Sequence, residues 1–310
     1  MKKSGLFFLF LLFTWGLQAQ YARHSIGKYQ FNALSINPAF AGSQDFGSFE
    51  MTYLGNFVGE FSLFRSIQVN LQAPFWSSDH SHWGTTFNFE KAGANIELGL
   101  RPAYSYSVDL DIGRISFGGV LGFSLFDFDE NLLTTPVTEF RNFLSINGGL
   151  GVYLSSENYF AGVSTIQMFE KDFLEESRVL GQNFNRENPY YFIGGFKTRI
   201  SERFELKPSI LLKYSNIYLL PETGGEVDPD EFAADLNLTL IIEDNYYVSG
   251  FFGLSSYADD TKLTRYGLAV HLLMNNFRLS YGIQRMSRTG TNLDLPQSHL
   301  FSLGYYFLDE

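Results

Sequence analysis

The chain has 310 residues, of which 45% are hydrophobic, 17% aromatic and 18% charged. It contains no cysteine, which excludes disulfides, thiolate zinc sites and a cysteine nucleophile. With 22 Lys and Arg against 33 Asp and Glu, the net charge is -11, which argues against a nucleic-acid partner held by phosphate contacts.

The N-terminus has the pattern of a secretory signal peptide. Met1-Lys2-Lys3 is basic, Leu6 to Trp15 is almost wholly apolar, and Ala19 is a small residue suited to cleavage before Gln20. An uncleaved anchor is the alternative, but the apolar core is shorter than the ~18 residues that a spanning helix needs. Removing residues 1–19 takes away two lysines and leaves 20 basic residues against 33 acidic ones, a net charge of -13.

Residues 20–46 precede the first predicted strand. We predict three parts of the chain: a signal peptide over 1–19, a periplasmic or plug segment over 20–46, and a β domain over 47–310. Within the second part, Asn37-Pro38 is predicted to turn the chain towards the first strand. Four apolar residues of this segment are expected to bury surface in or under the barrel: Tyr29, Phe31, Ile36 and Phe40.

Beyond residue 20, no apolar stretch is long enough for a transmembrane helix, and the mean hydropathy is -0.06. Instead, apolar residues alternate with small or polar ones over long segments, as in 96–109, 203–214 and 232–243. Two classes fit this pattern: an exported soluble β protein, and an outer-membrane β-barrel.

The alternation predicts fourteen strands, an even number. They lie near 47–57, 63–73, 82–91, 95–109, 112–126, 142–155, 157–168, 189–200, 203–214, 232–243, 245–256, 262–274, 276–287 and 298–307. Pro102 and Pro208 fall inside two of them, which suggests bulges or displaced strand boundaries.

The predicted connections alternate between short and long. They are tight around Leu110-Asp111, Ser156-Glu157, Ser201-Glu202, Asp244 and Asn275-Asn276, and long over 127–141, 169–188, 215–231 and 288–297. Outer-membrane barrels have short periplasmic turns and longer outer loops, whereas a soluble sandwich has no reason to keep this rhythm. The pattern therefore favours an all-β, antiparallel transmembrane barrel of about 14 strands, with both termini periplasmic.

The last predicted strand supports the barrel. Its aromatic and apolar residues share one face, as expected of a closing strand: Phe301, Leu303, Tyr305 and Phe307. A barrel of fourteen strands lies between small barrels filled by their own side chains and wide porins, so we expect something to fill its lumen.

The polar strand faces carry mostly basic charge. The predicted lumen cations are Arg101, Arg114, Lys197, Arg199, Lys207, Lys213, Arg265 and Arg278, against Glu97, Glu205 and Asp235. Paired charges that only brace the barrel are the favoured interpretation. The alternative is an electrostatic seat for an acidic plug or passenger segment.

No catalytic residue, cofactor site or firm metal site is predicted. The best metal candidate, His80-Ser81-His82, has no evident third ligand, and histidines of a turn beside Trp76 and Trp83 at the membrane interface are favoured. Acidic clusters in the long connections are most simply solvated loops, with calcium binding as the alternative. They are Asp127, Asp129 and Glu130; Glu170, Asp172, Glu175 and Glu176; Glu222, Glu226, Asp228, Asp230 and Glu231; and Asp259 and Asp260.

Two terminal blocks carry a family resemblance. The block Asn37-Pro38-Ala39-Phe40-Ala41-Gly42 and the closing block 298–307 resemble the PorP/SprF family of the type IX secretion system. In the first block, Asn37, Pro38, Ala39 and Gly42 match the family motif, and we expect a structural role for them because Pro fixes φ and Gly tolerates unusual backbone. No catalytic residues come with the family.

The resemblance implies an outer-membrane accessory protein of gliding and adhesin-secreting bacteria. Its implied partners are a secreted adhesin with a type IX C-terminal signal, other translocon components and outer-membrane lipid. The alternative function is a diffusion or uptake channel for small hydrophobic or anionic solutes.

Overall fold

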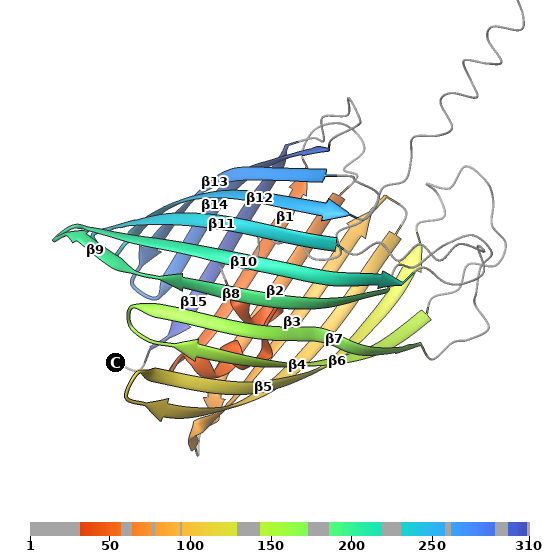
Figure 1. The fold of residues 1–310 in the computed structure, drawn as a ribbon, viewed down its shortest axis with the longest axis horizontal. Helices are drawn as coiled ribbons and strands as arrows, with labels where there is room; N and C mark the ends of the chain where they lie inside the picture. Colours follow the sequence, from red (N-terminus) through yellow and green to blue (C-terminus); the bar gives the residue numbers. More distant parts are fainter. Residues whose placement is uncertain are drawn as a thin grey trace, which may run out of the picture.

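The structure, a computed structural model, describes residues 32–56, 64–75, 78–93, 95–128, 143–172, 186–218, 231–257, 262–288 and 297–308 (Figure 1). Two short 3₁₀ helices, η2 (Ala33–Ser35) and η3 (Pro38–Ser43), precede the strands. The strands are β1 (Gly47–Asn56), β2 (Phe64–Phe75), β3 (Ser78–Ala92), β4 (Asn95–Leu110), β5 (Gly113–Phe128), β6 (Phe143–Ser155), β7 (Tyr159–Asp172), β8 (Arg186–Phe196), β9 (Thr198–Ser201), β10 (Phe204–Tyr218), β11 (Glu231–Ile242), β12 (Tyr246–Tyr257), β13 (Lys262–Met274), β14 (Phe277–Arg288) and β15 (Ser298–Phe307).

These strands form one closed antiparallel sheet. Apart from β8 and β9, strands that follow one another in the chain pair with each other, and β1 pairs with β15 over ten residue pairs, which closes the ring. β8 and β9 both pair with the same side of β10 and are two pieces of one wall strand. The wall therefore has fourteen positions, and the predicted antiparallel barrel of about 14 strands is confirmed. Closure removes the exposed edges that an open sheet would present.

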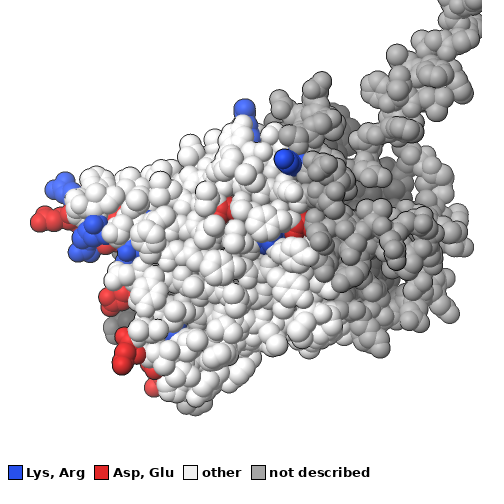
Figure 2. Space-filling view, in the orientation of Figure 1, with Lys and Arg blue, Asp and Glu red and all other residues white. Residues whose placement is uncertain are grey.

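The period of two in the sequence separates the two faces of the wall. Along β13, Tyr266, Leu268 and Val270 are exposed, whereas Arg265 and Ala269 on the alternate positions are buried. The exposed face is apolar all round the barrel, and Figure 2 shows few charged residues on this flank, with most of them gathered at one rim. An apolar exterior and a polar interior are the arrangement that lipid requires. No helix among the described residues has the length and apolar character needed to cross a membrane.

The two rims differ as the loop lengths predicted. At one rim, strands are joined by short turns such as 111–112, 202–203 and 275–276. Glu243, Asp244 and Asn275 have positive φ there, which tight hairpin turns commonly require. The first residue of β1 and the last residue of β15 lie opposite each other at this same rim. Below, we call it the short-turn rim; the connections 129–142, 173–185 and 219–230 start and end at the other rim.

The two prolines within strands have different effects. At Pro102 the pairing between β4 and β5 is interrupted at two residues without a change of register. Pro208 in β10 lies beside the break between β8 and β9, which falls at Lys197. Because proline lacks an N–H, it cannot donate to a ladder, so an interruption on one side is the expected result.

Candidate functional site: the lumen and its plug segment

Residues 32–46 lie inside the barrel, and we call them the plug segment. Helix η3 contacts β2, β3, β4, β5 and β6, and η2 contacts β3. Figure 1 shows both helices enclosed by the strands. The plug residues are mostly buried, with Ala39 at 0% exposure and Ile36 at 4%. The other two apolar residues predicted to be buried here, Tyr29 and Phe31, lie outside the described residues.

Two asparagines set the local shape of the plug segment. The side-chain oxygen of Asn32 accepts a hydrogen bond from Leu34 N at 2.8 Å and caps η2. The side-chain oxygen of Asn37 likewise accepts from Ala39 N at 3.0 Å and caps η3, where Pro38 occupies the first turn. Asparagine is a favoured N-cap, and proline fits the first turn because its missing N–H has no helical partner there.

Asn37 also ties the plug segment to the wall. Its side-chain amide donates to the backbone oxygen of Val152 at 3.1 Å and lies 3.4 Å from that of Val163, on the paired strands β6 and β7. A second tie comes from Ser164, whose hydroxyl donates to Ile36 O at 2.7 Å. The family-motif asparagine therefore caps a helix and joins that helix to two strands.

Glycines of the wall make room for these contacts. A Cβ at Gly118 would collide with backbone atoms of Pro38 and Ala39, and one at Gly151 would collide with the Asn37 side chain. Gly84 stands in the same relation to Leu34. In the plug segment itself, a Cβ at the motif residue Gly42 would lie 2.8 Å from the Ser116 hydroxyl and 3.0 Å from that of Ser105. We call this part of the wall, β3 to β7, the plug wall; where the plug segment approaches it most closely, it presents residues with little or no side chain.

An apolar core joins the plug segment to the far side of the lumen. Its plug members are Ala33, Ile36 and Ala39, and its wall members are Tyr153, Ile166, Tyr191, Ile193, Leu211 and Ala233. Phe40 contacts Tyr153 edge-on, with ring centroids 5.3 Å apart, and Tyr153 stacks on Phe160 at 6.2 Å. These wall members lie on five neighbouring wall strands, β6, β7, β8, β10 and β11, so the plug segment and the wall together fill the lumen on that side.

The end of the plug segment is held at the short-turn rim. Arg114 of β5 forms ion pairs with Asp45 and with Asp109, the latter at 2.7 Å. Beside them, the Gln72 amide donates to the side-chain oxygen of Gln44 at 2.8 Å. These contacts fix the chain just before it enters β1.

The remaining wall is polar and tightly paired. Its ion pairs include Lys213–Glu231 at 2.7 Å, Arg265–Asp235 at 3.1 Å, and Arg278–Glu50. A hydrogen-bonded chain crosses four strands: Thr239 to Ser249 at 2.8 Å, Ser249 to His271 at 3.1 Å, and His271 to Ser280 at 3.0 Å. We call this region, from β10 through β15 to β1, the ionic wall.

Seven of the eight predicted lumen cations lie within 4.0 Å of a carboxylate. Arg101 pairs with Glu97, and both Lys197 and Arg199 pair with Glu205 near the short-turn rim. Lys207 is the exception, because no carboxylate of the described chain lies that close to it. Glu231, predicted in an acidic loop cluster, is instead a buried partner of Lys213 in β11.

The histidine pair has no third metal-binding side chain grouped with it in the described part of the chain. His80 and His82 lie in β3, which begins four residues earlier than predicted, and not in a turn. His82 is 1% exposed, whereas His80 is exposed with its ring 5.9 Å from that of Tyr106. No group of three metal-binding side chains occurs among the described residues. Most of the acidic loop clusters lie outside those residues, so calcium binding there stays a prediction.

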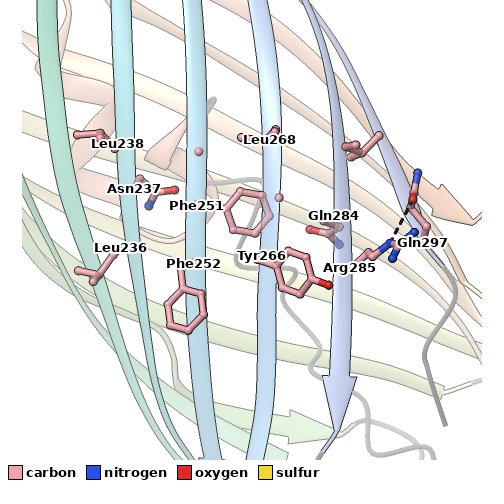
Figure 3. A pocket seen from close by; sticks show the side chains of 13 residues that line it. Leu236, Asn237, Leu238, Phe251, Phe252, Tyr266, Leu268, Gln284, Arg285 and Gln297 are labelled. Carbon is pink, nitrogen blue, oxygen red and sulfur yellow. Dashed lines mark hydrogen bonds between the residues drawn. The ribbon is translucent and has the colours of Figure 1, made fainter.

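The terminal strand residues face outwards. Phe301, Leu303 and Phe307 are exposed on β15, and Tyr305 contacts Phe277 with ring centroids 4.8 Å apart. They therefore belong to the lipid-facing surface of the strand that closes the ring. A depression of about 710 Å³ also lies on this outer surface, lined by Leu236, Leu238, Phe252, Tyr266 and Leu268 among others (Figure 3). Its lining is mostly apolar, and the polar residues Arg285 and Gln297 also line it.

The sequence reasoning did not single out the plug-wall glycines or the capping role of Asn32. A signal was available, because Gly84, Gly118, Gly151 and Gly162 all fall on the polar face of an alternating strand. Glycine within a strand marks a close approach by other atoms, so four of them on inward positions could have indicated what fills the lumen.

The fold is shared with outer-membrane channels of known structure. The CymD monoaromatic hydrocarbon channel matches with a TM-score of 0.56 and 11% identity, covering 93% of this chain and 94% of that chain. The toluene transporter TodX of Pseudomonas putida matches with a TM-score of 0.52 and 10% identity, covering 89% and 93%. At this identity the likeness concerns the fold alone. Among curated proteins, none matches this sequence.

The sequence itself assigns the family. The model of the type IX secretion system membrane protein PorP/SprF matches residues 18–305, nearly the whole chain, including the first terminal block and most of the second. The resemblance drawn from those blocks is confirmed. The fold and the family together place this barrel in the outer membrane as a component of the type IX secretion system. The chain belongs to the PorP/SprF family.

Proposed function

We propose that the protein is a non-enzymatic accessory of the type IX secretion system, which supports the secretion or surface attachment of a partner adhesin carrying a type IX C-terminal signal. The observation that carries this proposal is the plug segment. The residues of the family motif around Asn37 fill the lumen, and Asn37 bonds the plug segment to β6 and β7. They do not line an open passage. A barrel filled in this way suits a docking role better than free diffusion.

The orientation is part of the proposal. Both ends of the barrel chain lie at the short-turn rim, and short turns are periplasmic in outer-membrane barrels. Epitope tags inserted within 173–185 or 219–230 should then be labelled on intact cells, whereas tags at Asp244 or Asn275 should not. The reverse labelling pattern would overturn this orientation.

An enzymatic role has little support in the lumen. Ser249 and His271 form a hydroxyl–imidazole pair of the kind that hydrolases use, at 3.1 Å. A hydrolase also needs a group that orients the imidazole, usually a carboxylate, and free N–H donors for the oxyanion. Here the second imidazole nitrogen bonds to Ser280, and the neighbouring backbone takes part in strand pairing.

The alternative function is a diffusion or uptake channel for small hydrophobic or anionic solutes. It is favoured by the shared fold with proteins named as hydrocarbon channels, and the filled lumen weighs against it. Purified protein in planar bilayers separates the two functions. A wide and steady conductance in the unmodified protein would favour transport, whereas the accessory role predicts a closed barrel.

The decisive test of the accessory role uses the secreted proteins. In a strain that lacks this protein, at least one secreted adhesin should disappear from the cell surface, and the wild-type gene should restore it. A variant with residues 32–43 replaced by a Gly-Ser linker of equal length should insert as a heat-modifiable barrel and yet fail to restore display. If that variant displays the adhesin normally, the plug segment has no part in the function.

A further inference from the structure

Lys207 is unusual among the cations of the lumen. It lies on the inner face of β10, its side chain is exposed, and no carboxylate of the described residues lies within 4.0 Å of it. Arg101, Lys213, Arg265 and Arg278 all have such a partner. In an interior where charges are otherwise paired, an unpaired ammonium indicates either solvent or an absent ligand.

The surroundings of Lys207 increase its attraction for anions. The charged groups that act on it most strongly are Lys197 and Arg278, both positive. Each of these has a carboxylate of its own, Glu205 at 3.4 Å from Lys197 and Glu50 beside Arg278. The two carboxylates are thus already engaged, and the ammonium of Lys207 is left to neutralise an incoming charge.

One side of this position is aromatic. The Lys207 ammonium lies 5.0 Å from the centroid of the Phe160 ring. Phe160 stacks on Tyr153, and Tyr153 contacts Phe40 of the plug segment. A ligand at Lys207 would therefore meet an apolar floor beside a cation, and that floor continues to the plug segment.

The position also faces the short-turn rim. Lys207 is three residues from the start of β10 at Phe204, a distance of roughly 10 Å along the strand. On its other side lies the apolar core around Ile36 and Leu211. A ligand that arrives from the short-turn rim would reach the lysine and then stop at this core.

We propose that Lys207 and Phe160 form a binding site for an acidic, partly apolar polypeptide segment that enters the lumen from the short-turn rim. The cation recognises a carboxylate of the segment, and the Phe160 ring contacts an adjacent apolar side chain. The proposal rests on the proposed function only for the identity of the protein that carries this segment.

The absence of cysteine makes a direct electrostatic test available. Ser209 is the next inward residue of β10, so a Ser209→Cys variant reports on the potential beside Lys207. For each cysteine variant, the modification rate of an anionic methanethiosulfonate is divided by that of a cationic one. This ratio should be higher for the Ser209→Cys variant than for a Ser201→Cys variant at the rim. One charge at about 8 Å in water acts with opposite sign on the two reagents, which corresponds to a rate ratio on the order of fivefold. Adding Lys207→Gln should remove that preference.

A peptide then tests the ligand class. An alternating Asp-Leu peptide should slow modification of the Ser209→Cys protein. An Asn-Leu peptide of equal length should need at least about a tenfold higher concentration for the same protection. Lys207→Gln should abolish the difference. Arg203→Gln is the matched control, because it removes one positive charge from the rim of the same strand pair, where Arg203 is 76% exposed and pairs with Glu243.

Three results would overturn the site: equal protection by both peptides, no protection by either, or an unchanged difference in the Lys207→Gln variant. Anion preference without peptide protection would also overturn it, because Lys207 would then attract small ions only. The assay uses purified barrel and no secretion component. Its failure is therefore distinguishable from a failure of the proposed function, which is read from adhesin display on cells.

Discussion

The plug wall and the ionic wall fill the same lumen by opposite means. Along β3 to β7, the inward positions next to the plug segment include glycine and serine, such as Gly84, Gly118, Gly151 and Ser116, and atoms of the plug segment occupy space that larger side chains would otherwise take. Along β10 to β15 and β1, many inward positions carry charged or polar side chains that pair across the strands, as Lys213 does with Glu231, Arg265 with Asp235 and Arg278 with Glu50. The first wall is completed by the plug segment, whereas the second is held mainly by its own side chains, with Lys207 left without a carboxylate among the described residues.

This difference predicts which substitutions destabilise the whole barrel and which affect only the plug segment. A charge left without its partner in a dry interior destabilises the barrel as a whole, because the remaining ion has no water to solvate it. A lost contact at the plug wall should instead release the plug segment and leave the strand ladders intact. Stability of the barrel and seating of the plug segment are thus separable properties.

The largest effect is expected in the ionic wall. Lys213→Met keeps most of the side-chain volume but leaves Glu231, which is 1% exposed, without its cation. Removing one partner of a buried ion pair costs about 3–5 kcal/mol, so urea unfolding of the barrel in lipid vesicles should shift by that amount. The double variant Lys213→Met/Glu231→Gln removes the stranded charge and should recover most of the loss. A double variant that is no more stable than the single one would contradict this account.

A smaller effect, confined to the plug segment, is expected at Gly118. Gly118→Ala places a methyl group against the backbone of Pro38 and Ala39, and overpacking of this kind costs about 1–3 kcal/mol. Hydrogen exchange should become faster over residues 33–43 and stay unchanged in the strands. Gly119→Ala is the matched control, because the nearest atom to that Cβ, on the Leu150 side chain, is at an ordinary 3.6 Å. Equal exchange in the two variants would show that the plug segment does not depend on this approach.

The sequence predicted the wall better than the contents of the lumen. Alternation of apolar and polar residues is a local pattern, and thirteen of the fourteen predicted strands correspond to single strands of the structure. The exception, 189–200, is divided at Lys197, where Pro208 of the opposing strand interrupts the ladder. Pro208 therefore indicated where the sheet is irregular, but not that the neighbouring strand would be divided in two.

The interior depends on pairings between distant residues, which periodicity does not encode. Asn37 meets β6 and β7 more than a hundred positions later in the chain, and Arg278 meets Glu50 from the other end of the sequence. The polar face could be predicted as basic, but which carboxylate neutralises which cation follows only from the closed register. Lys207 could not be told apart from the paired cations for the same reason.

The third prediction compares two capping residues within the plug segment. Asn37→Ala removes the cap of η3 together with the bonds to Val152 and Val163, at a cost of about 1–2 kcal/mol in local opening. Asn32→Ala removes only the cap of η2 and should cost less, because no bond from the Asn32 side chain to the wall is seen in the described structure. Hydrogen exchange at residues 33–43 measures both. A larger effect from Asn32 would mean that the wall contacts of Asn37 contribute little.

The smallest effect is expected at the rim, where the plug segment meets β1. Asp45 is 78% exposed, so its ion pair with Arg114 is screened by solvent, and pairs of this kind contribute about 0.2–1 kcal/mol. Asp45→Asn should therefore leave barrel unfolding unchanged and only slightly accelerate exchange near Gln44. The residual effect should vanish at about 1 M salt, where the screening length falls to about 3 Å. Asp109→Asn serves as the comparison variant, because it removes the other ion pair of Arg114, at 2.7 Å, and leaves Asp45 in place. If Asp45→Asn released the whole plug segment, the rim contact and not the glycine-lined wall would hold that segment in the lumen. The proposed difference between the plug wall and the ionic wall would then be wrong.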